Sequence, residues 1–365
     1  MKKNKIVFVI NNYEFFETHR KELLNYLSKK NEVHLITNLT GKHSEFKNTY
    51  HLNIERRSLS IFDNLFTSLK LLRLLKKIKP THTFFISFKP MALGIISSLM
   101  LTKTKKYLIF SGLGYAFINR TFKARFAKGV IKILLSIYSL IGSKFIFQNL
   151  DDFQTINELV TIKEANKHII SGNGINPKAF KSREKKLIDK KLSFLFVGRL
   201  LLDKGVTELL GAIELINSNA RFILVAPEDN QNRASLDPGI KKNYDSRKYI
   251  QFFDRVDQDD LKKLYSNSDV FILPSYREGL PRAALEAMCS KLPLILTDVP
   301  GCRECVVHGE NGFLVEPQNI ESLAEAINAF IHKPEMVKKM GDKSYQIVEE
   351  KFSTGKIFKE YVELL

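Results

Sequence analysis

The chain has 365 residues, 44% of them hydrophobic and 26% charged, which excludes a disordered chain and predicts about two domains. Three cysteines, Cys289, Cys302 and Cys305, are too few for a disulfide scaffold and suit a reducing compartment. No apolar stretch approaches the roughly 18 residues of a membrane span. We therefore expect a cytoplasmic protein that is not integral to a membrane.

The charge of +18 is confined to the first half of the chain. Residues 64–150 contain 15 basic residues and no acidic one. Such asymmetry favours a polyanionic partner, either nucleic acid or an anionic membrane surface. No helix-turn-helix, zinc-finger or RNA-binding signature occurs, so we expect a membrane surface and no nucleic acid.

Residues 120–142 predict a basic amphipathic helix of the kind that lies in a lipid interface. Its basic and apolar residues alternate at helical spacing: Arg120, Lys123, Arg125, Lys128, Lys132, and Phe122, Phe126, Val130, Ile133, Leu134. The alternative is an ordinary helix whose apolar side is core, and for its Ile- and Leu-rich half we favour that interpretation.

Predicted strands and helices alternate along both halves of the chain. In the first half the strands are 6–10, 32–37, 83–88, 107–112, 145–149 and 168–171, with helices at 18–30 and 64–79. A polar linker at 181–191 is followed by strands at 193–198, 221–226, 249–253, 270–274, 292–298 and 312–316. Helices are expected near 205–217 and 259–266 and from Pro281. The pattern predicts an α/β protein of two doubly wound domains facing across a cleft, with ligand at the carboxyl ends of the strands.

We place the first domain at 1–180, the second at 181–350, and a helix at 351–365 that crosses back to the first.

Two stretches of the second domain carry the chemistry. In LPSYREGLPRAALEA, Glu278 lies in a loop after a strand, Pro281 starts a helix, and Glu286 lies in its second turn. The amides of Arg282, Ala283 and Ala284 between the two carboxylates predict an anion site, so the order suits a nucleotide diphosphate sugar. The alternative gives Glu278 a capping role and leaves Glu286 on the surface.

The second stretch, SFLFVGRLLLDKG, places two cations after a strand. Gly198 ends the strand, Arg199 follows, and Lys204 lies in the loop, where both cations can neutralise a diphosphate. Neither a Walker loop nor a G-x-G-x-x-G fingerprint occurs.

Together these motifs, with GCRECVVHGENGFLV, resemble retaining glycosyltransferases of family 4, which have the GT-B fold of two Rossmann-like domains. Upstream, NYEFFETHRKEL, SFKPMALGIISSL, FSGLGYAF, FQNLDDF and GNGINPKAF resemble the subgroup that extends polyprenyl-diphosphate-linked oligosaccharides. The resemblance implies an acceptor-binding first domain and a nucleotide-sugar-binding second domain, with no metal and no cofactor.

The resemblance also implies residue roles. Arg199 and Lys204 would hold the donor diphosphate, Glu278 would contact the transferred sugar, and Glu286 would bind the ribose. Further substrate contacts are expected at Gly112, Gly114, Asn173, Gly198, Gly279 and Leu280. His19 and Arg20, at a predicted helix start, either contact the acceptor or lie on the helix surface. Lys89, at a strand end, is expected to bind an acceptor phosphate.

Two other signals are weak. Asp257-Gln258-Asp259 resembles a metal-binding string, but it precedes a helical segment, and we expect a helix cap. Cys302 and Cys305 with His308 lack a fourth metal ligand, so we expect reduced structural cysteines.

The sequence thus predicts a retaining, metal-independent transferase. It would move a hexose or N-acetylhexosamine from a UDP-linked donor to a polyprenyl-diphosphate saccharide, in surface polysaccharide or glycan synthesis. We expect it at the cytoplasmic face of the inner membrane. Two alternatives stay open: a non-catalytic nucleotide-sugar binding protein at the membrane surface, and a nucleotide-sugar epimerase of the same fold.

Overall fold

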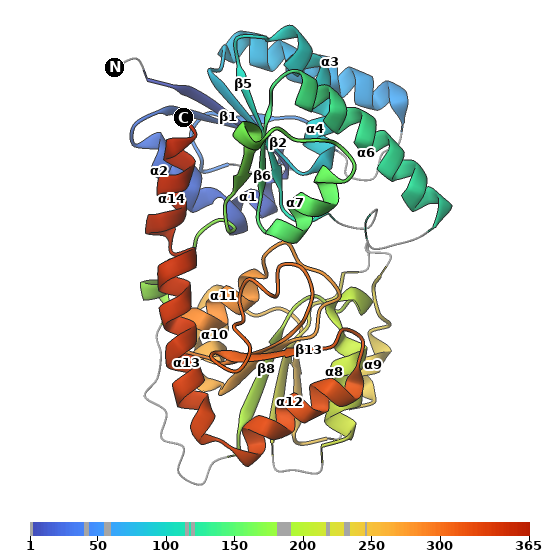
Figure 1. The fold of residues 1–365 in the computed structure, drawn as a ribbon, viewed down its shortest axis with the longest axis vertical. Coiled ribbons are helices and arrows are strands. Elements are labelled where there is room, and N and C mark those ends of the chain that lie inside the picture. The colour runs from blue at the N-terminus through green and yellow to red at the C-terminus, as the bar shows by residue number, and fades with distance from the viewer. Residues whose placement is uncertain are drawn as a thin grey trace. The chain divides into compact units, whose positions relative to one another are not determined.

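The computed structural model describes residues 3–39, 44–54, 60–113, 117, 121–180, 191–216, 220–229, 234–244 and 247–365. Their packing divides the chain into two compact units (Figure 1). Unit 1 comprises Met1–Gly174 and Thr354–Leu365, and unit 2 comprises Ile175–Ser353. The predicted linker at 181–191 lies, except for Lys191, outside the described residues.

Unit 1 is built on a parallel sheet whose described strands have the order β3-β2-β1-β4-β5-β6-β7. The strands are β1 (Lys5–Asn12), β2 (Glu32–Asn38), β3 (Thr49–His51), β4 (His82–Ile86), β5 (Lys105–Phe110), β6 (Lys144–Phe147) and β7 (Lys167–Ile169). In β1, Ile6 and Phe8 face one hydrophobic cluster while Val7 and Val9 face another, because side chains of a strand alternate between the faces. The order reverses between β1 and β4, which makes that pair the topological switch point of this sheet.

Helices cover both faces of the unit 1 sheet. One face packs against α1 (Tyr13–His19), α2 (Lys21–Ser28) and α14 (Thr354–Glu363). The other packs against α3 (Ile61–Ile78), α4 (Phe88–Met100), α6 (Phe122–Leu140) and α7 (Leu150–Asn157). The last helix of the chain is therefore part of the unit 1 core, where Ile357, Phe358 and Tyr361 are buried.

The predicted helix over 18–30 is wrong in its start and its continuity. The helical segment begins at Tyr13, because the Asn12 side chain accepts a hydrogen bond from the Phe15 amide and caps α1. It is divided at Arg20, which has non-helical backbone angles of φ −126° and ψ −12°. The fully buried Arg20 side chain points into the core and donates a 2.8 Å hydrogen bond to Tyr361 Oη.

Unit 2 has a second parallel sheet, with the described strands in the order β10-β9-β8-β11-β12-β13. They are β8 (Ser193–Val197), β9 (Arg221–Val225), β10 (Ile250–Phe253), β11 (Val270–Leu273), β12 (Leu294–Thr297) and β13 (Gly312–Val315). Numbered from β8, this is the 3-2-1-4-5-6 order of the Rossmann fold, with its switch point between β8 and β11. The predicted strands thus occur within two residues of their expected ends.

The main helices of unit 2 are α8 (Val206–Glu214), α9 (Gly239–Lys242), α10 (Gln258–Asn267), α11 (Arg282–Cys289), α12 (Ile320–His332) and α13 (Glu335–Ile347). A π-helical turn, Val348–Phe352, follows α13. Two parallel α/β domains confirm the predicted fold class. Among the described helices, none combines the length and the apolar character that crossing a membrane requires.

Candidate functional site

An ion pair lies at the switch point of the unit 2 sheet. Lys204 follows β8 and Glu278 follows β11, and Lys204 Nζ lies 2.5 Å from Glu278 Oε1. The two side chains are only 19% and 14% exposed. In open α/β sheets, ligands bind outside the carboxyl ends of the strands at this point. The structure therefore brings together two residues that are 74 positions apart, at the place where the fold favours a ligand.

Gly205 allows Lys204 to reach this position. Its backbone is left-handed, with φ +70°, and a Cβ atom there would lie 2.0 Å from the carbonyl oxygen of Pro274. The turn after β8 thus packs directly against the strand end that leads to Glu278. Sequence reasoning missed this role, although a glycine directly after the lysine was visible in the DKG string.

The loop that carries Glu278 is held from several sides. Ser275 Oγ donates a 2.7 Å hydrogen bond to Glu278 Oε1, and the Tyr276 amide donates to the Asp203 carbonyl at 2.9 Å. The Tyr276 hydroxyl donates to Glu208 Oε1 on α8 at 2.6 Å. These contacts fix the carboxylate relative to β8 and α8.

Gly301 packs closely against the backbone of the same loop. Its φ is +79°, and a Cβ atom there would lie 2.5 Å from the Glu278 carbonyl oxygen and 2.6 Å from that of Gly279. The Glu278 amide also donates to the Pro300 carbonyl at 3.2 Å. The glycine of the GCRE string therefore has a physical role, because it lets the loop that carries Glu278 pack closely.

Arg199 lies on the same edge and is also paired. Its Nη1 atom is 2.5 Å from Asp229 Oδ2, and its side chain is about half exposed. Gly198 precedes it, and the Gly198 amide donates to Val225 at the end of β9. Both predicted cations of the diphosphate site are thus held by carboxylates in this structure, Lys204 by Glu278 and Arg199 by Asp229.

Glu286 lies in the second turn of α11, as predicted. Its carboxylate accepts hydrogen bonds from Arg282 Nε at 2.9 Å and from the Tyr265 hydroxyl at 3.2 Å. Burial, reinforced by the nearby Glu286 carboxylate, raises the pKa of Tyr265 well above its usual value, so this hydroxyl stays a donor. Each carboxylate oxygen has two lone pairs, so Glu286 keeps acceptor capacity for a ligand hydroxyl.

The N-terminus of α11 differs from the prediction in one amide. The amide of Ala284 donates to the Pro281 carbonyl at 3.1 Å, so it is not available to an anion. Arg282 and Ala283 are the first two residues after Pro281, which provides no side-chain cap. Gly279 and Leu280 lie between Glu278 and this helix, half-buried in the loop.

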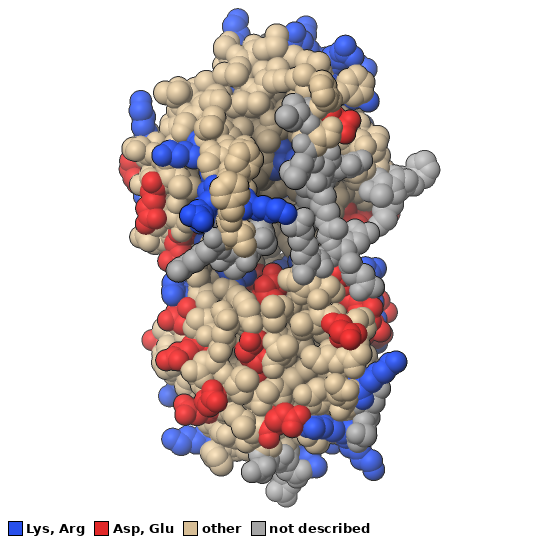
Figure 2. Space-filling view, turned by 90° about the vertical axis from the view of Figure 1, so that its right-hand side faces the viewer, with Lys and Arg blue, Asp and Glu red and all other residues tan. Residues whose placement is uncertain are grey.

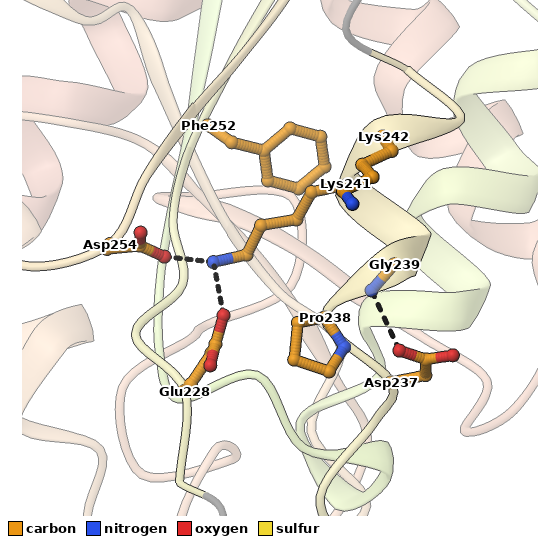
Figure 3. Close-up of a pocket in the computed structure, with 8 residues that line it drawn as sticks. All are labelled: Glu228, Asp237, Pro238, Gly239, Lys241, Lys242, Phe252 and Asp254. Carbon is orange, nitrogen blue, oxygen red and sulfur yellow. Dashed lines mark hydrogen bonds and ion pairs between the residues drawn. The ribbon is translucent and has the colours of Figure 1, made fainter.

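A pocket of about 580 Å³ lies further along the same sheet edge, at the ends of β9 and β10 (Figure 3). Its lining residues are Glu228, Asp237, Pro238, Gly239, Lys241, Lys242, Phe252 and Asp254. Lys241 extends between Asp254 and Glu228 and forms ion pairs with both. Three carboxylates against two lysines disfavour an anion in this pocket. Glu228 is followed by Asp229, the partner of Arg199, so the pocket adjoins the Arg199 pair along the chain.

Two of the predicted residues of unit 1, Gly112 and Asn173, follow strands at the carboxyl edge of its sheet. Gly112 follows β5 with φ +98°, and Gly114 lies outside the described residues. Asn173 follows β7, and its buried Oδ1 atom has no hydrogen-bond partner among the described residues. At the switch point of this sheet, Asn11 Nδ2 donates to Ser87 Oγ at 2.9 Å, a pair that sequence reasoning missed. The Ser87 backbone has φ +71° and ψ 164°, a conformation that residues other than glycine rarely adopt, which marks a constrained position.

His19, Arg20 and Lys89 occupy three different environments. His19 ends α1 rather than starting a helix, and its ring stacks on Phe15 at 4.5 Å. Arg20 is fully buried against Tyr361, so it is not on a helix surface. Lys89 lies in the first turn of α4, where its Nζ donates to Asn64 Oδ1 at 2.6 Å.

The weak signals are resolved by local contacts. Asp257 caps α10, accepting a 2.8 Å hydrogen bond from the Asp260 amide, which confirms the predicted cap. Cys302 and Cys305 are buried free thiols, and burial raises the pKa of each well above its usual value. The described residues contain no cluster of histidine, cysteine or carboxylate side chains that would hold a metal ion.

Comparison with known proteins identifies the family. Residues 178–347 match the model of glycosyl transferases group 1, and residues 5–149 match a glycosyl transferase 4-like model. The capsular polysaccharide biosynthesis glycosyltransferase CapM of Staphylococcus aureus is 25% identical, covering 99% of this chain and 96% of that protein. An N,N'-diacetylbacillosaminyl-diphospho-undecaprenol alpha-1,3-N-acetylgalactosaminyltransferase of Campylobacter jejuni is 29% identical, over 76% of this chain and 74% of that protein.

Solved structures agree in fold. Sucrose-phosphate synthase of Thermosynechococcus elongatus superposes with a TM-score of 0.82 at 19% identity, over 99% of this chain and 98% of that one. Anabaena HepE, solved with UDP and glucose, gives 0.79 at 16% identity over 99% of both chains. The chain is thus a glycosyltransferase with the GT-B fold. Its C-terminal part, residues 178–347, is a domain of the glycosyl transferases of group 1, and its N-terminal part, residues 5–149, is a glycosyl transferase 4-like domain.

Proposed function

We propose that the protein is a retaining transferase that moves a hexose or N-acetylhexosamine from a UDP-sugar to a polyprenyl-diphosphate-linked saccharide. The observation that carries the proposal is the Lys204–Glu278 pair at the unit 2 switch point. It places a cation for the leaving diphosphate beside a carboxylate for the hydroxyls of the sugar that is transferred. The UDP and glucose bound to HepE, and the undecaprenol-linked acceptor in the name of the Campylobacter relative, support this choice of substrates.

The donor would lie along the carboxyl edge of the unit 2 sheet. The pocket beyond β9 and β10 would take the uncharged nucleoside end, because its carboxylates repel phosphate. Arg199 and Lys204 would then hold the diphosphate. Glu286 would accept a hydrogen bond from a ribose hydroxyl while it keeps its bonds to Arg282 and Tyr265.

Donor binding changes the partner of Lys204. In the structure the Lys204 ammonium pairs with Glu278, and a bound diphosphate would compete for its three N–H donors. As the glycosidic bond breaks, negative charge grows on the leaving phosphate, and a fixed cation there stabilises the transition state more than the ground state. Glu278 is then freer to interact with the sugar, while Ser275 still holds its carboxylate.

Unit 1 would bind the acceptor, with Asn11, Ser87, Gly112 and Asn173 at the carboxyl edge of its sheet. We place the enzyme at the cytoplasmic face of the inner membrane, where a polyprenyl diphosphate presents its charged end. A donor panel tests the function: the purified protein is incubated with a lipid-linked saccharide and single UDP-sugars. We expect one donor to extend the acceptor by one sugar with the donor's anomeric configuration. An inverted product, or no product with any UDP-sugar, would contradict the proposal.

We also expect transfer to need no metal ion. Arg199, Lys204 and the α11 N-terminus would supply the positive charge that a divalent cation supplies elsewhere. Activity should stay within about twofold when a chelator is added, because a preformed cation site is unaffected by chelation. A complete loss of activity that added metal restores would show that the charge comes from a bound ion.

A further inference from the structure

Helix α3 presents an apolar stripe to solvent. The stripe lies on one side of the helix, because its residues are alternately three and one positions apart: Phe62, Leu65, Phe66 and Leu69. All four are exposed, and Phe62 is 85% exposed. The opposite side of the helix, with Leu71, Leu75 and Ile78, fills the core. The exposed side chains of the stripe therefore do not form part of the unit 1 core.

Helix α6 carries a second stripe along its length. Phe122, Phe126, Val130, Ile133 and Leu140 are exposed, with Phe122 at 79% and Leu140 at 86%. The expectation that the Ile- and Leu-rich half is core is therefore wrong for Val130, Ile133 and Leu140. Leu135 and Tyr138, on the other side, are buried and hold the helix on the sheet.

Both stripes belong to the same face of unit 1. Helices α3, α4 and α6 pack on one side of the sheet, and α4 contacts both of the others (Figure 1). Leu99 and Met100, at the end of α4, are exposed as well. We call the exposed apolar residues of α3 and α6 the α3–α6 platform. Soluble proteins rarely expose so many large apolar side chains together unless something covers them.

Basic side chains accompany the platform. Those on its two helices are Lys70, Arg73, Lys76, Lys77, Lys123, Arg125, Lys128 and Lys132. Asp63 is the one acidic residue of the two helices. Within the described residues, no ion pair joins these cations to a carboxylate, and Lys70 Nζ lies 4.4 Å above the Phe66 ring. On the face drawn in Figure 2, blue and tan side chains cover most of the upper part of unit 1.

We propose that the α3–α6 platform docks on an anionic lipid leaflet, with the phenylalanines inserted and the lysines and arginines among the headgroups. Charge complementarity selects this occupant, because cations flanking an apolar stripe match a surface that is anionic outside and hydrocarbon inside. Aliphatic residues such as Val130, Ile133 and Leu140 gain nothing from nucleic acid. Long lysine and arginine side chains reach the headgroups while the stripe lies deeper.

The platform also adjoins Lys89, which the sequence predicts to bind an acceptor phosphate. Lys89 donates to Asn64, which lies in the first turn of α3 between Phe62 and Leu65. Docking would therefore bring Lys89 close to the leaflet in which a polyprenyl diphosphate is embedded. The docking inference itself rests on α3 and α6 alone and holds whatever sugar the protein transfers.

Vesicle sedimentation tests the platform. Parent protein and the variant F62S/F66S/F122S/F126S are mixed with neutral phosphatidylcholine vesicles, or with vesicles that contain about 30% phosphatidylglycerol. The matched control is L215S/Y249S, which replaces exposed apolar residues of unit 2. We expect parent and control to bind the anionic vesicles, and the four-fold variant to bind them roughly tenfold or more weakly. Neutral vesicles should bind all three poorly.

A charge variant separates attraction from insertion. Even at low salt, K123E/R125E/K128E should bind anionic vesicles much more weakly than the parent. Binding of the parent should itself weaken as salt rises, because surface charges are screened over ~8 Å at physiological salt. Activity on a short soluble acceptor should survive in both variants. If the four-fold variant unfolds, as its melting curve would show, F62S/F66S and F122S/F126S are tested separately, and each should weaken binding.

Two results would overturn the inference. One is a folded phenylalanine variant that binds anionic vesicles as tightly as the parent. The other is parent protein that does not bind the vesicles and sediments as a dimer, while the phenylalanine variant sediments as a monomer. The platform would then be an interface between two copies of this chain.

Discussion

Replacing Glu278 by alanine should reduce kcat by roughly 100-fold or more with little change in the donor KM. Glu278 would touch the sugar that moves, and contacts that strengthen in the transition state affect turnover. The substitution also removes the ion-pair partner of Lys204, whose ammonium then stays available to the donor diphosphate, so donor binding is retained. Glu278→Gln keeps the size of the side chain and the Ser275 contact and should show a similar loss of kcat.

Glu286→Ala should fail differently. A ribose contact is much the same in the ground state and the transition state, so the donor KM should rise roughly tenfold with kcat nearly unchanged. The substitution also removes the acceptor of the buried Tyr265 hydroxyl, so melting curves must accompany the kinetics. Glu310→Ala is the control, because Glu310 forms an exposed 3.5 Å pair with Lys343. Equal losses in kcat and KM for both Glu278 and Glu286 variants would contradict the assigned roles.

The second large effect is expected from Gly205→Ala. The new Cβ atom would lie 2.0 Å from the Pro274 carbonyl oxygen. The backbone at this position also has a left-handed conformation, which is unfavourable for alanine. The turn after β8 would have to move, and Lys204 would move with it. We expect a loss of ~3 kcal/mol or more in the free energy of unfolding, with activity falling roughly 100-fold or more in protein that still folds.

Gly142→Ala is a matched control for this prediction. Gly142 has φ +71°, almost the same backbone angle as Gly205, but no atom of the described residues outside its immediate chain neighbours lies within 4 Å of its Cβ position. It should cost only about 1 kcal/mol. Denaturant unfolding of both variants separates strain from crowding. Equal losses would mean that the close approach to Pro274 contributes nothing.

Much of the fold could be predicted because the strands are buried on both sides. Runs such as IVFVI and VFILP are typical of strands covered on both faces, and their alternation with helices predicts parallel sheets with right-handed crossovers. The order of the strands within each sheet was not predicted. That Lys204 and Glu278 lie in one donor site could also be predicted, because both follow strands whose carboxyl ends meet at one edge of the sheet. Their direct ion pair was not predicted.

Other features depend on tertiary contacts that no local pattern encodes. Arg20 interrupts a helical pattern because its side chain is drawn into the core by Tyr361, which lies 341 residues later. Gly205 and Gly301 look like ordinary turn glycines until the backbone opposite them is known. The α3 stripe resembles a core stripe in sequence, since periodicity shows that a helix has an apolar side and not whether that side is covered.

The most direct measurement of the central claim is UDP release from a UDP-sugar with and without a lipid-linked saccharide acceptor. If the protein is a transferase, UDP release should rise with acceptor concentration, and one sugar should be added to the acceptor for each UDP released. The Glu278 variants should lose this release. UDP released at the same rate without acceptor would instead indicate an epimerase or a hydrolase. Tight donor binding without any release, in a protein that folds and binds UDP, would indicate a binding protein and contradict the account.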